Sequence, residues 1–158
     1  MNQESFEYFV NKYGEPYESL RFFKCQLISD FSPLSRLKNL KAVYINWNIR
    51  TDKLWDMWNN TSLIHPVMRI VKNHRQSLPA SNGKNLKTVA INGSMFKKFQ
   101  LDNLSNFENT ALLECINLRN VKPENRNLDF LKTLPHLSEF NFDAGMFTTE
   151  EIAYMCAR

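Results

Sequence analysis

The stretch Leu40-Lys41-Ala42-Val43-Tyr44-Ile45 carries an apolar residue, two variable ones, a second apolar residue, one variable one and a third apolar residue. Alternation at its end predicts a short strand whose apolar side chains point into a core. The pattern returns in register along the chain, which indicates an internal repeat. The other copies are Leu20, Phe23 and Cys25 (the weakest); Leu86, Val89 and Ile91; Leu113, Ile116 and Leu118; and Leu137, Phe140 and Phe142.

One further copy is expected between Leu40 and Leu86, because that gap is about two repeat lengths. His65, Met68 and Ile70 fit the spacing, although a histidine then takes the first apolar place and is expected to be partly buried. A unit of this size cannot bury its own apolar face, whereas a stack of units can. The predicted repeats start near residues 20, 40, 65, 86, 113 and 137.

Leucines spaced by three precede two of the predicted strands. Leu34 and Leu37 lie ahead of Leu40, and Leu131 and Leu134 lie ahead of Leu137. This spacing predicts a short helix or 3₁₀ turn whose apolar side faces the same core as the strand. Each repeat is thus expected to be a strand, a turn and a short helical return. Looser versions of the spacing are Leu54 with Met57 and Leu104 with Phe107.

The ends of the chain are predicted to cap this stack. Residues 1–19 are rich in aromatic residues and form the expected N-terminal cap, and the repeats then occupy residues 20–147. Thr148 or Thr149 is a candidate N-cap for a closing helix over residues 148–158, with acidic residues in its first turn. The sequence therefore predicts one domain with three parts.

The ladder resembles the leucine-rich-repeat superfamily over residues 20–158, and Asp143–Ala153 looks like the end of short bacterial leucine-rich-repeat proteins. The resemblance implies an α/β solenoid with a parallel sheet on its concave face, helical returns on its convex side, and a role in recognising proteins. The asparagine of the family's repeat is kept at Asn48 and Asn73. Irregular turns are expected where it is replaced, at Ile28, Ser94, Val121 and Gly145.

Composition restricts the function classes. The 158 residues carry a net charge of +4, and residues 57–101 contain no Asp or Glu but seven Lys or Arg. Three scattered cysteines without a CxxC pair argue against a disulfide framework or a zinc site. No signal peptide or membrane-spanning run is evident, so we expect a cytoplasmic monomer that binds no cofactor and no membrane.

The side chains that alternate with the inward residues are predicted to line the concave sheet and to bind a protein partner of acidic character. Tyrosine and arginine are favoured because they combine contact area with directional bonds. For any single residue, ordinary exposure on a twisted sheet is the competing interpretation. The candidates are Phe22, Lys24, Tyr44, Asn46, Trp47, Arg69, Asn92, Asn117, Arg119, Asn141 and Asp143.

The tryptophans near the second repeat and the basic segment 57–101 each allow a second interpretation. Trp55 and Trp58, spaced by three, are interpreted as core residues of a helical return, which leaves Trp47 as the surface candidate. The acid-free segment 57–101 provides enough cations for nucleic-acid binding, although it contains no recognised nucleic-acid motif.

Catalysis has no support, since GxSxG, HExxH and GxxxxGK[ST] are all absent. The sequence thus predicts a non-enzymatic protein-interaction module, of which an immunity or adaptor protein is one specific form.

Overall fold

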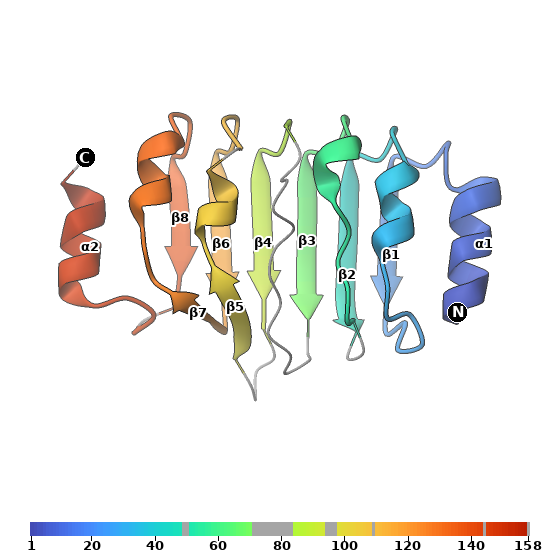
Figure 1. Cartoon of the computed structure of the whole chain (residues 1–158), viewed down its shortest axis with the longest axis horizontal. Coiled ribbons are helices and arrows are strands. Elements are labelled where there is room, and N and C mark those ends of the chain that lie inside the picture. Colours follow the sequence, from blue (N-terminus) through green and yellow to red (C-terminus); the bar gives the residue numbers. More distant parts are fainter. Residues whose placement is uncertain (49–50, 71–83, 94–97, 109, 144, 158) are drawn as a thin grey trace.

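The computed structural model describes residues 1–48, 51–70, 84–93, 98–108, 110–143 and 145–157. Six strands of these ranges form one sheet, and every neighbouring pair is parallel (Figure 1). Parallel neighbours require a crossover between consecutive strands, and short helical returns lie in the crossovers that lead to β2, β3, β6 and β8. The strands in spatial order are β1 (Ser19–Phe23), β2 (Ala42–Asn48), β3 (His65–Ile70), β4 (Thr88–Asn92), β6 (Cys115–Arg119) and β8 (Glu139–Phe142).

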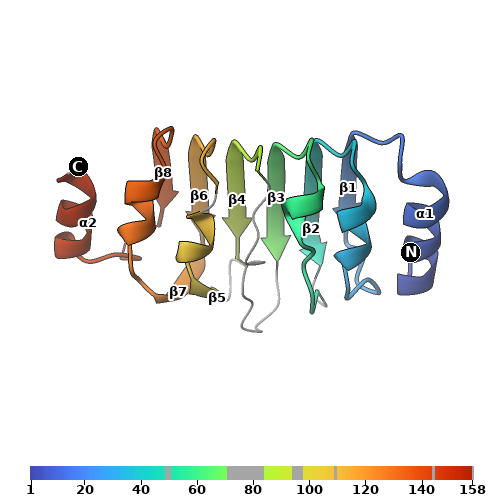
Figure 2. The ribbon, with the colours of Figure 1, turned by 45° about the horizontal axis from the view of Figure 1, so that its top comes forward.

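Short 3₁₀ helices lie on the other side of the core from the sheet, as the leucine spacing predicts (Figure 2). Leu34 and Leu37 are buried at η1, and Leu131 and Leu134 are buried at η4. The looser pairs, Leu54 with Met57 and Leu104 with Phe107, are buried as well. The returns in the described ranges are η1 (Ser32–Arg36), η2 (Met57–Asn59), η3 (Ser105–Phe107) and η4 (Asp129–Thr133).

Strand β1 has a different register from the predicted one. Leu20 pairs with Val43 and Phe22 with Ile45, so the first repeat is displaced by three residues from the copy read in the sequence. Phe22 is therefore a core residue, 5% exposed, and its prediction as a partner-binding residue is wrong. Phe23 points the other way and is 57% exposed, because successive residues of a strand face opposite sides.

The repeat between Leu40 and Leu86 is also displaced. Pro66 pairs with Val43 and Met68 with Ile45, which places Leu63, fully buried, at the position of Leu40. The predicted alignment on His65 is wrong, and His65 is exposed because it lies on the outer side of the strand. Repeats that begin at residues 17, 40, 63 and 86 are then 23 residues apart.

A second, two-stranded parallel sheet, unforeseen in the sequence, joins β5 (Phe99–Asn103) and β7 (Val121–Asn125), which follow β4 and β6 in the chain. Gly93 allows the backbone after β4 to lie close to the backbone after β6. Its N–H donates to the Arg119 carbonyl at 2.7 Å, and a Cβ there would lie 2.0 Å from the Asn120 carbonyl oxygen. Only glycine allows so close an approach of two backbones.

Two α-helices lie at the ends of the row of strands (Figure 1). In α1 (Gln3–Tyr13), Phe6 packs edge-on against Phe22 and Phe31, with ring centroids 5.5 Å apart in both pairs. This packing explains why Phe22 points inward. Helix α2 (Thr149–Cys156) begins at the N-cap Thr148, which forms a reciprocal capping box with Glu151.

One buried polar residue organises the returns. The Asn60 side chain donates to the carbonyls of Leu34 and Leu37, both at 2.8 Å, and accepts from the Trp55 indole N–H at 2.8 Å. Trp55 is fully buried, as predicted, but Trp58 is 42% exposed and the prediction of a core role for it is wrong. Asn60 thus satisfies backbone groups of the preceding return that the core would otherwise leave without partners.

Candidate functional site

The open face is the side of the six-stranded sheet that points away from the core. Its side chains form three rows that cross the strands, because equivalent residues of neighbouring parallel strands lie side by side. The first row is Ser19, Ala42, His65, Thr88, Cys115 and Glu139; the middle row is Arg21, Tyr44, Val67, Ala90, Asn117 and Asn141; the described members of the third row are Phe23, Asn46, Asn92 and Arg119.

Cations stacked on aromatic rings occupy the β1–β2 end of the open face. The Arg21 guanidinium lies 4.9 Å from the Tyr44 ring centroid, and the Lys24 ammonium lies 5.3 Å from that of Phe23. Neither cation has a carboxylate partner within the described part of the chain. Lys24 follows the strand rather than lying in it, with a φ of 53° and its N–H bonded to the Asn46 carbonyl at 3.0 Å.

The opposite end of the open face is polar. Asn117 and Asn141 are neighbours in the middle row, and the buried Asn117 Oδ1 has no hydrogen-bond partner among the described residues. Beside them the Cys115 thiol donates to Glu139 at 3.4 Å. Burial, followed by the hydrogen bond to Glu139, raises the pKa of Cys115, which makes it a poor nucleophile.

The centre of the open face is lined by small side chains that project little from the sheet. Val67 and Ala90 fill the middle row there, both partly buried, between the aromatic and the asparagine ends. In the first row, His65 Nδ1 lies 2.5 Å from Thr88 Oγ1. Small side chains thus form the floor of the open face, with larger polar ones around it.

Most of the predicted partner-binding side chains lie together on the open face. Asp143 is engaged elsewhere, since its carboxylate accepts the Asn120 backbone N–H in the turn after β6. The structure does not describe the side chains of Trp47, Asn48 and Arg69. Asn73 and Ser94 lie wholly outside the described residues. The predicted residues found on the face are Tyr44, Asn46, Asn92, Asn117, Arg119 and Asn141.

Arg21 and Phe23 are two open-face residues that the sequence interpretation missed. An available signal was the 23-residue spacing from Tyr17 to Leu40, which aligns Leu20 and Phe22 with the inward pair of the second repeat. The aromatic Tyr17 in place of the first leucine hid this alignment.

The basic residues described within segment 57–101 do not share one face. The Lys84 ammonium lies 4.3 Å from the Trp58 ring centroid, on the side of the returns. Lys87 forms an ion pair with Glu114 at 2.8 Å, ahead of β4 and β6. Lys72, Arg75 and Lys97 lie outside the described residues.

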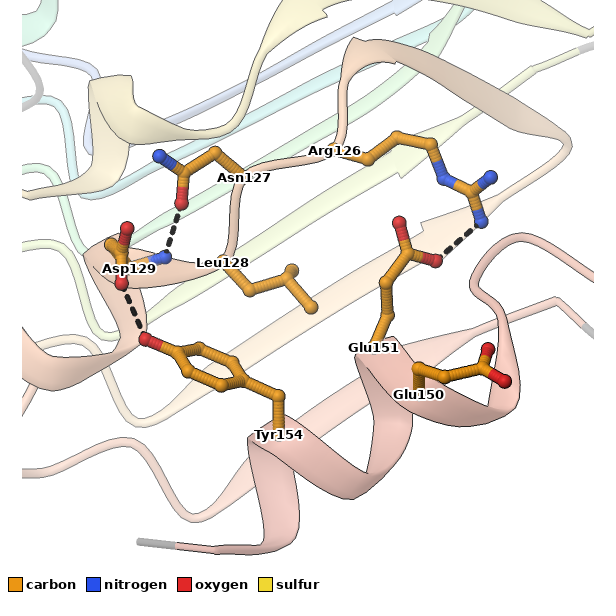
Figure 3. Close-up of a pocket in the computed structure, with 7 residues that line it drawn as sticks. All are labelled: Arg126, Asn127, Leu128, Asp129, Glu150, Glu151 and Tyr154. Carbon is orange, nitrogen blue, oxygen red and sulfur yellow. Dashed lines mark hydrogen bonds and ion pairs between the residues drawn. The ribbon is translucent and has the colours of Figure 1, made fainter.

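A pocket of ≈ 370 Å³ lies between α2 and the approach to η4 (Figure 3). Arg126 pairs with Glu151 at 2.7 Å, and the Tyr154 hydroxyl donates to Asp129. The pKa of Asp129 is lowered by that hydrogen bond first and then by Lys132. These side chains are partnered with one another, so the arrangement fastens α2 to the last repeat.

Neither a metal centre nor a membrane span is found within the described ranges. No three His, Cys, Asp or Glu residues are grouped there so as to hold an ion. A helix long and apolar enough to cross a bilayer is likewise absent, since α1 has 11 residues and α2 has 8.

Comparisons with known proteins relate the chain to a solved structure. No protein-family model and no curated protein sequence matches it. Internalin C2 from Listeria monocytogenes str. 4b F2365 superposes with a TM-score of 0.62 at 17% sequence identity. The match covers 87% of this chain and 55% of that one, so the chain spans about half the length of that internalin. The parallel sheet, the 3₁₀ returns and this match identify the fold as an α/β leucine-rich-repeat solenoid.

Proposed function

We propose that this protein is a non-enzymatic protein-interaction module that binds a partner of acidic character through the open face. The supporting observation is the pair of stacks at the β1–β2 end, Arg21 on Tyr44 and Lys24 on Phe23. Both cations lack a carboxylate partner among the described residues, although ion pairs occur elsewhere on the surface. Carboxylates of a partner would form ion pairs with these two cations.

The aromatic members of these stacks are suited to anchor a contact. Tyrosine and arginine dominate binding hot spots, and a large exposed aromatic ring such as Phe23 loses contact with water when a partner covers it. Cationic side chains add steering and selectivity for a negatively charged partner. The solenoid fold supports the proposal because a row of strands presents an extended surface for binding.

The test compares two cation–aromatic pairs on opposite sides of the solenoid. One variant carries Arg21→Glu and Tyr44→Ala on the open face, and its matched control carries Lys84→Glu and Trp58→Ala on the return side. Wild type and both variants are immobilised, and nuclease-treated extract of the source organism is passed over each. Quantitative mass spectrometry then measures every retained protein.

We expect an acidic protein to be retained by wild type and by the return-side control, and to fall at least about tenfold on the open-face variant. Equal retention on all three would refute the proposal. A separate salt titration with single-stranded DNA addresses the basic segment. Tight binding that falls linearly with salt on logarithmic axes would favour nucleic acid instead.

A further inference from the structure

Four asparagines of the described residues lie on the open face, although asparagine is depleted in strands. Asn46 projects from β2, Asn92 from β4, Asn117 from β6 and Asn141 from β8. A residue that opposes its local structure without a structural gain is expected at functional sites. No side-chain hydrogen bond joins any of the four to a described residue, so they make no visible contribution to the fold.

The carboxamide group supplies both donors and an acceptor, which is the combination that a polypeptide main chain presents in return. Asn117 differs from the other three, because its Oδ1 is buried and has no hydrogen-bond partner in the described residues. A buried acceptor of this kind is costly unless a donor reaches it. Because that oxygen is covered, a peptide N–H lying across the sheet would supply the donor once the Asn117 side chain turns outward on binding.

The spacing of three of these amides suits an extended chain. Asn92, Asn117 and Asn141 lie on β4, β6 and β8, which are consecutive in the sheet. Asn117 and Asn141 are neighbours in the middle row, whereas Asn92 pairs with Arg119 and lies two residues further along its strand, in the third row. Neighbouring strands are about 4.8 Å apart and an extended chain advances about 3.3 Å per residue, so a chain that crosses the strands obliquely would pass all three amides within about four residues. Such a segment would run across the strands beside the small side chain of Ala90, which pairs with Asn117.

Charge complementarity indicates which side chains this segment carries. Arg21 and Lys24 lie at the β1–β2 end, and the exposed Arg119 lies beside the asparagines; none of the three has an ion-pair partner in the described ranges. We propose that the open face binds an extended, acidic segment of a partner polypeptide, with its main chain hydrogen-bonded by Asn92, Asn117 and Asn141. This inference rests on the proposed function, and adds the conformation and the main-chain recognition of the partner.

The probe is an array of unstructured twelve-residue peptides in acidic, neutral and basic sets, together with a twelve-residue oligothymidylate. The tightest peptide is made again with N-methyl groups on alternate main-chain nitrogens, which removes donors and keeps every side chain. Fluorescence anisotropy measures its affinity for wild type and for three variants. These are Asn92→Val with Asn117→Val, Arg21→Glu with Tyr44→Ala, and the control Asn59→Ala, an exposed asparagine of η2.

We expect the tightest peptide to be acidic, and to lose at least about tenfold in affinity with the asparagine pair and with N-methylation, but not with Asn59→Ala. Urea unfolding of each variant checks that its fold is intact.

Other outcomes overturn the inference in distinguishable ways. If Arg21→Glu with Tyr44→Ala abolishes binding while the asparagine pair and N-methylation do not, the main-chain recognition is wrong and the proposed function stands. If no peptide binds but a folded partner is retained through the open face, an extended segment is wrong. If neither peptide nor partner depends on the open face, or if the oligothymidylate binds there more tightly than every peptide, both proposals are wrong.

Discussion

The interior and the open face of the six-stranded sheet come from alternate residues of the same strands, yet they hold different chemistry. Inward residues such as Val43, Ile45 and Ile116 are fully buried and aliphatic. Their outward neighbours include Tyr44 and Asn117, and vary in charge, size and polarity from strand to strand. The interior therefore needs only apolar volume at a fixed spacing, whereas the open face is free to specialise.

This difference shows which substitutions report on folding and which report on binding. A change on the inward side removes packing and is felt throughout the stack, because each repeat depends on its neighbours. A change on the outward side removes little packing, and its effect is expected in the affinity for a partner. Adjacent residues of one strand allow the two effects to be compared directly.

The largest expected effect separates Phe22 from Phe23. Phe22→Ala should lower the free energy of unfolding by about 3–5 kcal/mol, because it empties a site enclosed by Phe6 and Phe31. Phe23→Ala should lower it by less than about 1 kcal/mol, because that ring is mainly exposed. Urea titration followed by circular dichroism measures both, and equal losses would mean that the register of β1 is wrong.

The second effect contrasts a buried asparagine with an exposed one. Asn60→Ala should lower the free energy of unfolding by about 2–3 kcal/mol, because the Trp55 indole and two carbonyls lose their partner inside the core. Asn59→Ala, one residue earlier and exposed, should change it by less than about 0.5 kcal/mol. The same urea titrations decide this, and a neutral Asn60→Ala would contradict the role given to this side chain.

The sequence was informative where a repeat kept leucine at its first position. Leu86 and Leu113 place β4 and β6 correctly, since three apolar residues at fixed spacing leave only one register. In the first repeat, the run Leu20-Arg21-Phe22-Phe23 offers an apolar residue to either face, and only the contact with Phe6 decides between them. In the third, Pro66 replaces the middle aliphatic residue and conceals Leu63 as the start.

Other features depended on contacts that no local pattern records. The β5–β7 sheet requires Gly93 and Asn120 to approach each other from different repeats. Trp58 lies three residues after Trp55 but on the exposed side of a return that is only three residues long. Most open-face candidates could be placed because strand alternation assigns a side once the register is known.

A third, smaller effect is pH-dependent and concerns the surface contacts that hold α2. The pKa of Asp129 is lowered in the folded protein, chiefly by the Tyr154 hydroxyl and then by Lys132. Its charged form therefore stabilises the fold above its unfolded pKa of about 3.9, and this contribution disappears as the pH falls through the lower folded pKa. Asp129→Asn should reduce the stability at pH 7 slightly and make its decline between pH 5 and pH 3 shallower.

Thermal unfolding across that pH range measures the effect. Glu4→Gln is the control, since Glu4 lies in α1 at the other end of the molecule. Identical pH profiles for wild type and Asp129→Asn would contradict the assignment.

The smallest expected effect has the opposite sign. Asn92→Val with Asn117→Val should raise the free energy of unfolding by up to about 1 kcal/mol, because valine is favoured in strands and the buried Asn117 oxygen is removed. Thr88→Val, on the same face, removes only the exposed contact with His65 and should change the free energy of unfolding by less than about 0.5 kcal/mol. Urea titration measures both, and a clear loss of stability in the asparagine pair would mean that these residues serve the fold.

Site-specific photocrosslinking tests the central claim, that partners bind the open face, most directly. The crosslinking residue p-benzoylphenylalanine replaces Tyr44 in one variant and Trp58, on the return side, in the other. Both are irradiated in extract of the source organism, and the adducts are identified by mass spectrometry. The account predicts a discrete protein adduct from position 44 and none of that protein from position 58. Adducts from position 58 alone, or the same adducts from both positions, would contradict it.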